Sequence, residues 1–277
     1  MAESRSGAAG SFLNVRPRYY RWHVDPGVDW TEANTRPAYL EWCLPVAECA
    51  LVLVDVWNSH YLRETRERTE RIIQERLRPL VEACRRHGLA VIHAPSPPNA
   101  HAHPQWVGRT GVGGARPIPP GPAAVSEQEP WPPLAFQRRE GKYAIYARPS
   151  EPREPELREF RRRLVIHPAV EPMAGEAVIA TGEELHRLCR ARGTLFLFFA
   201  GFNTNACILE RDYGLRAMAQ RGYACILVRD CTTGMESYRS LPTLGQTEAA
   251  IEKIEMFLGY TVSSVEMIAG FEERERR

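Results

Sequence analysis

Three short, strongly apolar segments constrain the fold of this chain more than any other feature. They are residues 48–55 (ECALVLVD), 195–202 (LFLFFAGF) and 223–230 (YACILVRD). Apolar runs of this length are typical of strands that a parallel sheet buries on both faces. Helical spacing of apolar residues follows the first segment over Glu64–His87, and further helical patterns separate the later ones. Because strands and helices alternate, we expect an α/β fold whose mainly parallel sheet is covered by helices on both faces.

Two regions depart from this alternation. Residues 1–46 are polar, aromatic and interrupted by proline, and we expect an irregular arm there. Residues 47–277 are expected to form one domain, because their length suits a single large α/β unit. A proline-rich stretch predicts an insertion at about residues 95–160, which forms either a lid over the site or a contact between subunits. A short strand or hairpin is predicted at 136–146, and short strands are predicted at 163–170 and 261–268.

Composition excludes several classes of protein. A net charge of +2 gives no indication of binding to nucleic acid or to a membrane surface. The N-terminal residues lack the apolar core of a secretory signal, and no apolar run is long enough to span a bilayer. Seven cysteines without a disulfide-like spacing favour a reducing compartment. We therefore expect a cytoplasmic protein that acts on a small molecule, with no nucleic-acid or membrane partner.

A candidate nucleophile follows the central apolar segment. That segment is followed by a polar elbow, residues 202–205 (FNTN), and Cys207 stands where the next helix is predicted to begin. The unpaired N–H groups and the positive dipole end of a helix N-terminus favour a thiolate over a thiol. The same N–H groups can hold the oxyanion of a tetrahedral intermediate. The position of Cys207 therefore predicts nucleophilic catalysis rather than a packing role.

Polar residues also follow the other two apolar segments. Asp55 and Asn58 come after the first, and residues 230–236 come after the third. Ligands of parallel sheets bind at the carboxyl ends of the strands. We therefore expect these residues and the Cys207 elbow to lie at one edge of the sheet.

Taken together, these motifs resemble the isochorismatase-like cysteine hydrolases. DVWN at Asp55–Asn58 resembles the D-x-x-N start of that family, GFNTNAC resembles its G-x-x-T-x-x-C elbow, and RDCTTGMES resembles its closing section. The resemblance covers Glu48 to Ile268, apart from residues 95–177. It implies a three-layer α/β/α sandwich around a mainly parallel sheet, here with the proline-rich insertion. It also implies hydrolysis of small amides, ureido compounds or vinyl ethers, and a homo-oligomer.

By position, the resemblance implies that Cys207 is the nucleophile and Asp55 the general base, with a cis peptide bond between Phe202 and Asn203. The lysine that completes the family's catalytic trio is missing, because its place reads GEAVIATGEELHRLC. Asp55 and a nearby thiolate repel each other, so a cation is still required. We take Lys142, in the insertion, as the candidate. The alternatives are Arg138, Arg139, Arg148 and His186.

Other residues are predicted to shape the pocket. We expect Asn203 and Thr204 of the elbow to bind the substrate or its oxyanion, and Trp57, Asn58 and His60 to line the pocket. The family's nicotinamidases bind metal through an Asp-x-His motif and a further histidine near this place. Three histidines here match in type but not in spacing, so no metal or other cofactor is expected, with zinc as the alternative; they are His93, His101 and His103.

The sequence therefore predicts a cysteine-dependent hydrolase that cleaves a C–N bond of a small amide or carbamoyl compound through a thioester intermediate. One alternative is a relative that lost catalysis with the lysine and binds a small metabolite. Another is a metal-assisted amidase that uses Asp55 and the histidines.

Overall fold

The computed structural model describes residues 11–111 and 131–272 and divides the chain into two units. Of the described residues, 131–164 belong to the second unit. They form α5 (Leu134–Gln137), a 3₁₀ segment at Gly141–Tyr146, and α6 (Glu154–Arg162). The strand or hairpin predicted at 136–146 is therefore wrong. Arg139 and Gly141 both adopt left-handed backbone conformations, which a strand does not accommodate.

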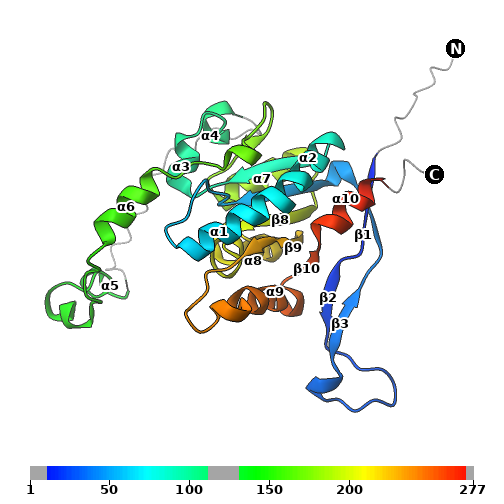
Figure 1. The fold of residues 1–277 in the computed structure, drawn as a ribbon, viewed down its shortest axis with the longest axis horizontal. Coiled ribbons are helices and arrows are strands. Elements are labelled where there is room, and N and C mark those ends of the chain that lie inside the picture. The colour runs from blue at the N-terminus through cyan, green and yellow to red at the C-terminus, as the bar shows by residue number, and fades with distance from the viewer. Residues whose placement is uncertain (1–10, 112–130, 273–277) are drawn as a thin grey trace. The chain divides into compact units, whose positions relative to one another are not determined.

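The first unit is built on an eight-stranded sheet with the order β3-β2-β10-β9-β8-β5-β6-β7 (Figure 1). Its six strands from β10 to β7 run parallel, as the apolar segments predicted, and β2 and β3 extend it in antiparallel fashion beyond β10. The strands are β2 (Arg18–Arg21), β3 (Arg36–Tyr39), β5 (Cys49–Val54), β6 (Ala90–Ala94), β7 (Ala177–Val178), β8 (Phe196–Phe202), β9 (Ala224–Thr233) and β10 (Tyr260–Val262).

Helices cover both faces of this sheet, which makes the fold the predicted three-layer α/β/α sandwich. One face carries α1 (Arg63–Ile72), α2 (Arg78–Arg86), which a π-helical turn joins to α1, and α10 (Ser264–Glu272). The other carries α7 (Gly182–Arg192), α8 (Leu215–Gln220) and α9 (Gly245–Phe257). The short helices α3 (Pro97–Ala102) and α4 (Val107–Thr110) follow β6. Within the described ranges, no helix has the length and apolarity needed to cross a membrane.

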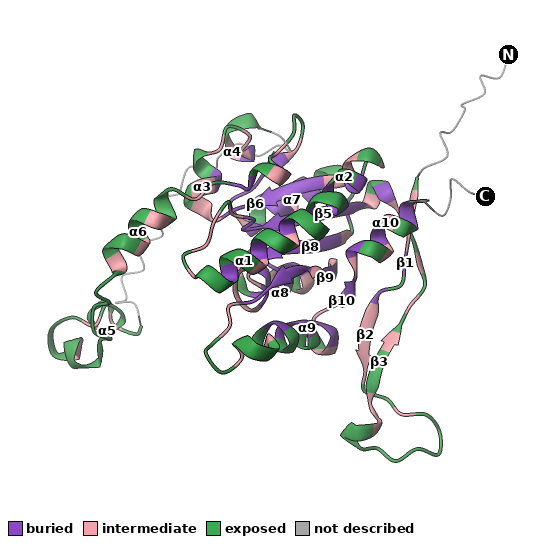
Figure 2. Cartoon of the chain, in the orientation of Figure 1, coloured by how far each residue is buried: buried purple, intermediate pink, exposed green. Residues whose placement is uncertain are grey.

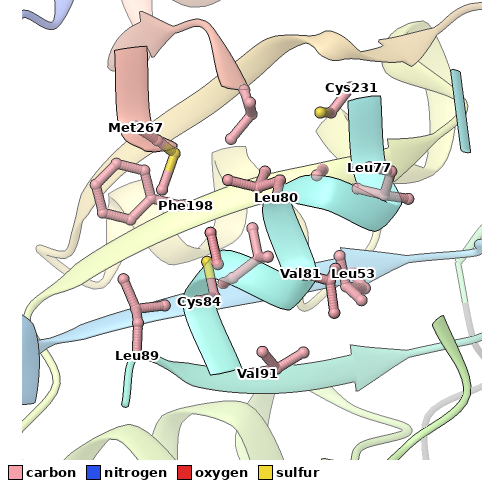
Figure 3. Close-up of a cluster of buried hydrophobic side chains, with 14 of the residues drawn as sticks. Leu53, Leu77, Leu80, Val81, Cys84, Leu89, Val91, Phe198, Cys231 and Met267 are labelled. Atoms are coloured by element: carbon pink, nitrogen blue, oxygen red, sulfur yellow. The ribbon is translucent and has the colours of Figure 1, made fainter. Parts of the chain in front are cut away.

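Alternate residues of the central strands build two separate cores. Leu53 and Phe198 pack on the α2 side against Leu80 (Figure 3), whereas Val52 and Phe199 belong to the core under α7, α8 and α9. The central strands are buried on both faces, and exposed residues lie on the outer sides of the helices that cover them (Figure 2). Each fully buried large apolar side chain contributes about 1.5–3 kcal/mol to folding. The packed sheet therefore holds the residues at the carboxyl ends of its strands in fixed positions.

The N-terminal region is more regular than we expected. Instead of an irregular arm, it forms β1 (Phe12–Val15) paired with β4 (Trp42–Pro45), and the β2–β3 hairpin that pairs with β10. The aromatic residues of β2, Tyr19 and Tyr20, favour a strand. Pro37 is tolerated because β3 is the last strand of the sheet, where a missing N–H breaks no ladder.

Of two short strands predicted from the sequence, the one at 163–170 is absent, and the last strand, predicted at 261–268, is present but ends at Val262. Residues 163–170 contribute only an isolated bridge between Ile166 and Trp57, followed by a 3₁₀ turn at Pro168–Val170. In the segment 261–268, β10 ends at Val262 and α10 begins at Ser264. Asp230 accepts hydrogen bonds from both the backbone N–H and the hydroxyl of Ser264, each at 2.7 Å. This cap starts the helix, and it uses a carboxylate that we expected near the site.

Candidate active site

Asp55 lies at the carboxyl end of β5, where the chain leaves the sheet in a left-handed conformation with φ of 46°. Its side chain is only 4% exposed. The hydroxyl of Ser96, directly beyond β6, donates to its Oδ1 at 3.0 Å, and the Arg211 guanidinium lies 3.5 Å from its Oδ2. A buried carboxylate is thus held in place by side chains from two other segments.

Close approach of β8 to β5 brings the elbow to Asp55. Gly201 of β8 has φ of 111°, and a Cβ atom there would lie 2.0 Å from the carbonyl oxygen of Val54. Only glycine therefore allows the two strands to meet at this point. One residue after Gly201, the peptide bond between Phe202 and Asn203 is cis, as the family resemblance implied.

Cys207 lies in the π-helical turn Thr204–Ile208 that follows β8, and its side chain is half-buried. The thiol lies close enough to the Asp55 carboxylate for each group to shift the pKa of the other. Arg211 follows one helical turn later, where its backbone N–H donates to the Cys207 carbonyl at 3.3 Å. Its guanidinium donates to Ser96 at 2.7 Å, and its positive charge lowers the pKa of Cys207. A thiol, a carboxylate and a cation therefore meet at the carboxyl edge of the sheet.

The electrostatics of this group differ from our prediction of a thiolate at a helix start. Burial raises the pKa of Cys207 to about 11, and the negative charge of the nearby Asp55 acts in the same direction. Arg211 and the Asn203 backbone lower that pKa, but by less than burial and Asp55 raise it. Burial also raises the pKa of Asp55, against the lowering effects of Cys207, Arg211 and Ser96. The resting thiol therefore keeps its proton, and the carboxylate it faces is placed to remove that proton during attack.

The remaining elbow residues divide into two kinds. Thr204, predicted to bind substrate, is buried and shares a 2.6 Å hydrogen bond with Thr232 of β9. Asn205 exchanges two side-chain hydrogen bonds with the backbone of Met235, which fixes the elbow to the loop after β9. Asn203 is different, because its side-chain oxygen is buried and has no hydrogen-bond partner among the described residues. The side-chain oxygen of Asn203 is therefore available to accept a hydrogen bond from a ligand.

Three predicted pocket residues lie in the segment between β5 and α1. Trp57 is half-buried and bridges to Ile166. Asn58 is exposed and exchanges hydrogen bonds with the backbone of Val165. His60 accepts from the Leu62 backbone at 3.0 Å, and burial lowers its pKa. These contacts shape the segment that follows Asp55, and the role of the three residues as a pocket wall stays a prediction.

Sequence reasoning did not find Arg211, the cation that lies beside Asp55, and the role of Lys142 stays a prediction. Lys142 lies in the second unit, where it is exposed and its ammonium group lies 5.1 Å from the centre of the Tyr143 ring. The alternative arginines, Arg138, Arg139 and Arg148, lie in the same unit. His186, on α7, is hydrogen-bonded to Tyr223 at 2.8 Å. The signal for Arg211 was its spacing of one helical turn from Cys207.

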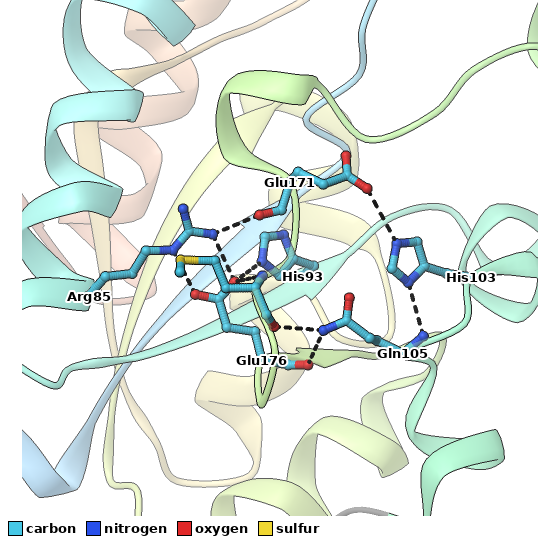
Figure 4. A network of polar contacts seen from close by, with 7 residues as sticks. Arg85, His93, His103, Gln105, Glu171 and Glu176 are labelled. Atoms are coloured by element: carbon cyan, nitrogen blue, oxygen red, sulfur yellow. Dashed lines mark hydrogen bonds and ion pairs between the residues drawn. The ribbon is translucent and has the colours of Figure 1, made fainter.

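His93, one of the histidines considered for a metal, takes part in a buried network (Figure 4). Its Nε2 lies 2.9 Å from the Glu176 carboxylate, which Arg85 also binds with two hydrogen bonds of 2.7 and 2.8 Å. Burial works against ionisation of Glu176, but Arg85 and His93 outweigh it and lower its pKa to about 2. This network ties β6, α2 and the segment before β7 together.

The other two histidines contact different partners. His103 lies 3.9 Å from Glu171, and the ring of His101 packs on Trp106 with centroids 4.5 Å apart. Among the residues that the structure describes, no group of three or more His, Cys, Asp or Glu side chains is arranged to hold a metal ion. His93, His101 and His103 therefore contact different partners in this structure, and the expectation that no cofactor is needed stays a prediction.

Comparison with known proteins identifies one family. The model of the isochorismatase domain matches residues 49–264. A cysteine hydrolase from Pseudomonas syringae pv. phaseolicola 1448A is 16% identical, with 83% of this chain and 95% of that one covered and a TM-score of 0.54, so the fold is shared. N-carbamoylsarcosine amidase from Thermoplasma acidophilum is 15% identical, with 78% and 96% covered and a TM-score of 0.43. A search of curated protein sequences gave no match.

Proposed function

Because the chain belongs to the isochorismatase family of hydrolases, we propose that it cleaves a C–N bond of a small amide or carbamoyl compound with Cys207 as nucleophile. The family includes amidases such as N-carbamoylsarcosine amidase and nicotinamidase. The observation that supports the proposal is that the Cys207 thiol lies beside the buried Asp55 carboxylate, which raises its pKa and which also contacts the guanidinium of Arg211. A protonated thiol next to a general base is the arrangement that nucleophilic catalysis requires.

In the first half of the reaction, Asp55 takes the proton of Cys207 while the sulfur attacks the substrate carbonyl carbon. The new C–S bond converts the carbonyl oxygen into an oxyanion, which backbone N–H groups of the elbow stabilise. Asp55 then gives its proton to the leaving nitrogen, the C–N bond breaks, and an amine and a thioester result.

In the second half, a water molecule attacks the thioester carbonyl, and Asp55 takes the proton of that water. The C–S bond breaks, the acid is released, and Asp55 returns the proton to the sulfur of Cys207. One water is consumed and the side chains end as they began. The raised pKa of Asp55 suits this cycle, because the carboxyl group must both accept and release a proton near neutral pH.

The proposal is tested by measuring amine or ammonia release from a panel of N-carbamoyl amino acids, heteroaromatic primary amides and short aliphatic amides. We expect turnover of at least one class by the natural protein and none by Cys207→Ser. Cys43→Ser is the matched control, because Cys43 is a free and exposed cysteine.

Two results contradict the proposal. The first is turnover that survives Cys207→Ser in a protein of unchanged melting temperature. The second is saturable binding of a panel compound without any turnover, which identifies the alternative, a protein that binds a small metabolite without cleaving it.

A further inference from the structure

The cation beside Asp55 comes from an unexpected place in the chain. The segment that carries the lysine in the family resemblance contains none here, and the chain has only two lysines, Lys142 and Lys253. The structure instead directs Arg211 at the reacting groups. Its guanidinium lies 3.5 Å from the Asp55 carboxylate, and it is close enough to Cys207 to lower the pKa of that thiol.

Several contacts fix Arg211 in this position. Its guanidinium donates to Ser96, whose hydroxyl in turn donates to Asp55. Two residues further along, the fully buried Tyr213 donates a hydrogen bond from its hydroxyl to the Pro95 carbonyl at 3.2 Å. The segments around Arg211 and Ser96 are thus tied together twice, which limits the freedom of the long arginine side chain.

The charged neighbours of Arg211 in the chain are engaged elsewhere. Glu210 pairs with Arg216 at 3.2 Å. The Asp212 carboxylate accepts a hydrogen bond from the backbone of Gly182 at the start of α7, at 2.8 Å. The titratable groups that act on Arg211 are therefore Asp55, Cys207 and Tyr213, and Asp55 is the strongest of them.

We propose that Arg211 is the catalytic cation of this site and that Asp55 alone moves the protons of the reaction. This inference rests on the proposed hydrolase function. A guanidinium group stays charged at any pH at which the protein is folded, so it cannot give a proton to the leaving amine, as a lysine can. Arg211 stabilises the negative charge that moves from Asp55 to the sulfur during attack, and its own protonation never changes.

The test compares Arg211→Gln, Arg211→Lys and the control Arg216→Gln in the full chain. Arg216 lies in α8 and pairs with Glu210 at the surface, so it is a matched arginine outside the site. The first readout needs no substrate: the rate at which iodoacetamide alkylates Cys207 at pH 9, followed by peptide mass spectrometry. We expect Arg211→Gln to slow alkylation about 3- to 10-fold, since the pKa of Cys207 rises when the cation is lost. Arg216→Gln is expected to match the natural protein.

The second readout is the pH dependence of kcat on an amide identified with the panel. We expect Arg211→Gln to lower kcat about 100-fold with little change in KM, and Arg211→Lys to restore most of it. In Arg211→Lys, kcat should also fall at high pH, because the lysine loses its charge there. The natural protein should show no such alkaline fall. Should Arg211→Gln fail to fold, this added alkaline fall still tests the inference.

An unchanged alkylation rate in folded Arg211→Gln overturns the inference. It is also overturned if Lys142→Ala lowers kcat and Arg211→Gln does not. These failures are separable from failure of the proposed function. Alkylation of Cys207 is measured without substrate, and normal turnover by Arg211→Gln contradicts only the role of Arg211.

Discussion

Replacing Asp55 by Asn is expected to abolish hydrolysis and, at the same time, to make Cys207 more reactive. Burial and the charge of Asp55 raise the pKa of Cys207, whereas Arg211 lowers that pKa and remains in the variant. Asparagine has the same shape as aspartate and tolerates the left-handed backbone at this position. It carries no charge and cannot act as a base.

The size of the effect follows from the pKa of Cys207, about 11. A thiol with that pKa is ionised in roughly one molecule in a thousand at pH 8. Unit charges about 4 Å apart interact by ~1 kcal/mol in water and ~4 kcal/mol at an effective dielectric constant near 20. For a half-buried thiol we expect the pKa to fall by about 1–2 units, at 1.36 kcal/mol per unit. The thiolate population then rises ~10- to 100-fold, and its weaker intrinsic nucleophilicity reduces the gain in alkylation rate to ~3- to 10-fold.

The assay is alkylation by iodoacetamide at pH 8, with peptide mass spectrometry on Cys207 and on the other cysteines as internal references. Burial raises the pKa of Asp55 in the folded state, so ionisation of this group costs stability as the pH rises through that pKa. The melting temperature of Asp55→Asn at pH 7 is therefore expected not to fall below that of the natural protein. Alkylation of Cys207 that is unchanged or slower in a folded Asp55→Asn protein would refute the reasoning, and retained turnover would refute the role of Asp55 as base.

Three further predictions follow from the geometry. Gly201→Ala should lower the free energy of unfolding by about 2–4 kcal/mol, measured by denaturant titration, because its Cβ would clash with the Val54 carbonyl; an unchanged midpoint contradicts the close approach of β8 to β5. Ser96→Ala should lower kcat about 10-fold with a small change in melting temperature, since its hydroxyl links Asp55 to Arg211; unaltered kcat shows that the link is dispensable. Glu176→Gln should destabilise the protein by up to about 3 kcal/mol at pH 7. The lowered pKa of Glu176 stabilises the fold above pH 4.5, and this contribution is lost as the pH falls toward 2. A difference in melting temperature between the variant and the natural protein that is the same at every pH argues against this contribution.

The parallel sheet could be predicted because its signal is local. Residues 49–54 and 195–202 are apolar throughout, and only strands buried on both faces need such runs. The elbow was equally visible, since Gly201 and Cys207 stand at a fixed spacing after a strand. The N-terminal hairpin lacked such a signal, because β2 and β3 are half-buried or exposed along their whole length.

What sequence reasoning missed depends on contacts between distant segments. The proposed role of Arg211 depends on Asp55 and Ser96, which are far away in the sequence and lie beside it only in the folded chain. The start of α10 at Ser264 depends in the same way on Asp230 of β9. The pKa of Cys207 depends on how deeply the folded sheet buries the thiol, and the helix-start argument considered only the local dipole.

The central claim, that Cys207 forms a covalent intermediate, is tested most directly by mass spectrometry of protein quenched in acid during turnover of an amide from the panel. The account predicts an added mass equal to the acyl group of the substrate, located on Cys207 and absent from Cys207→Ser. Turnover without any such adduct, in a rapid-quench series that resolves single turnovers, would contradict it.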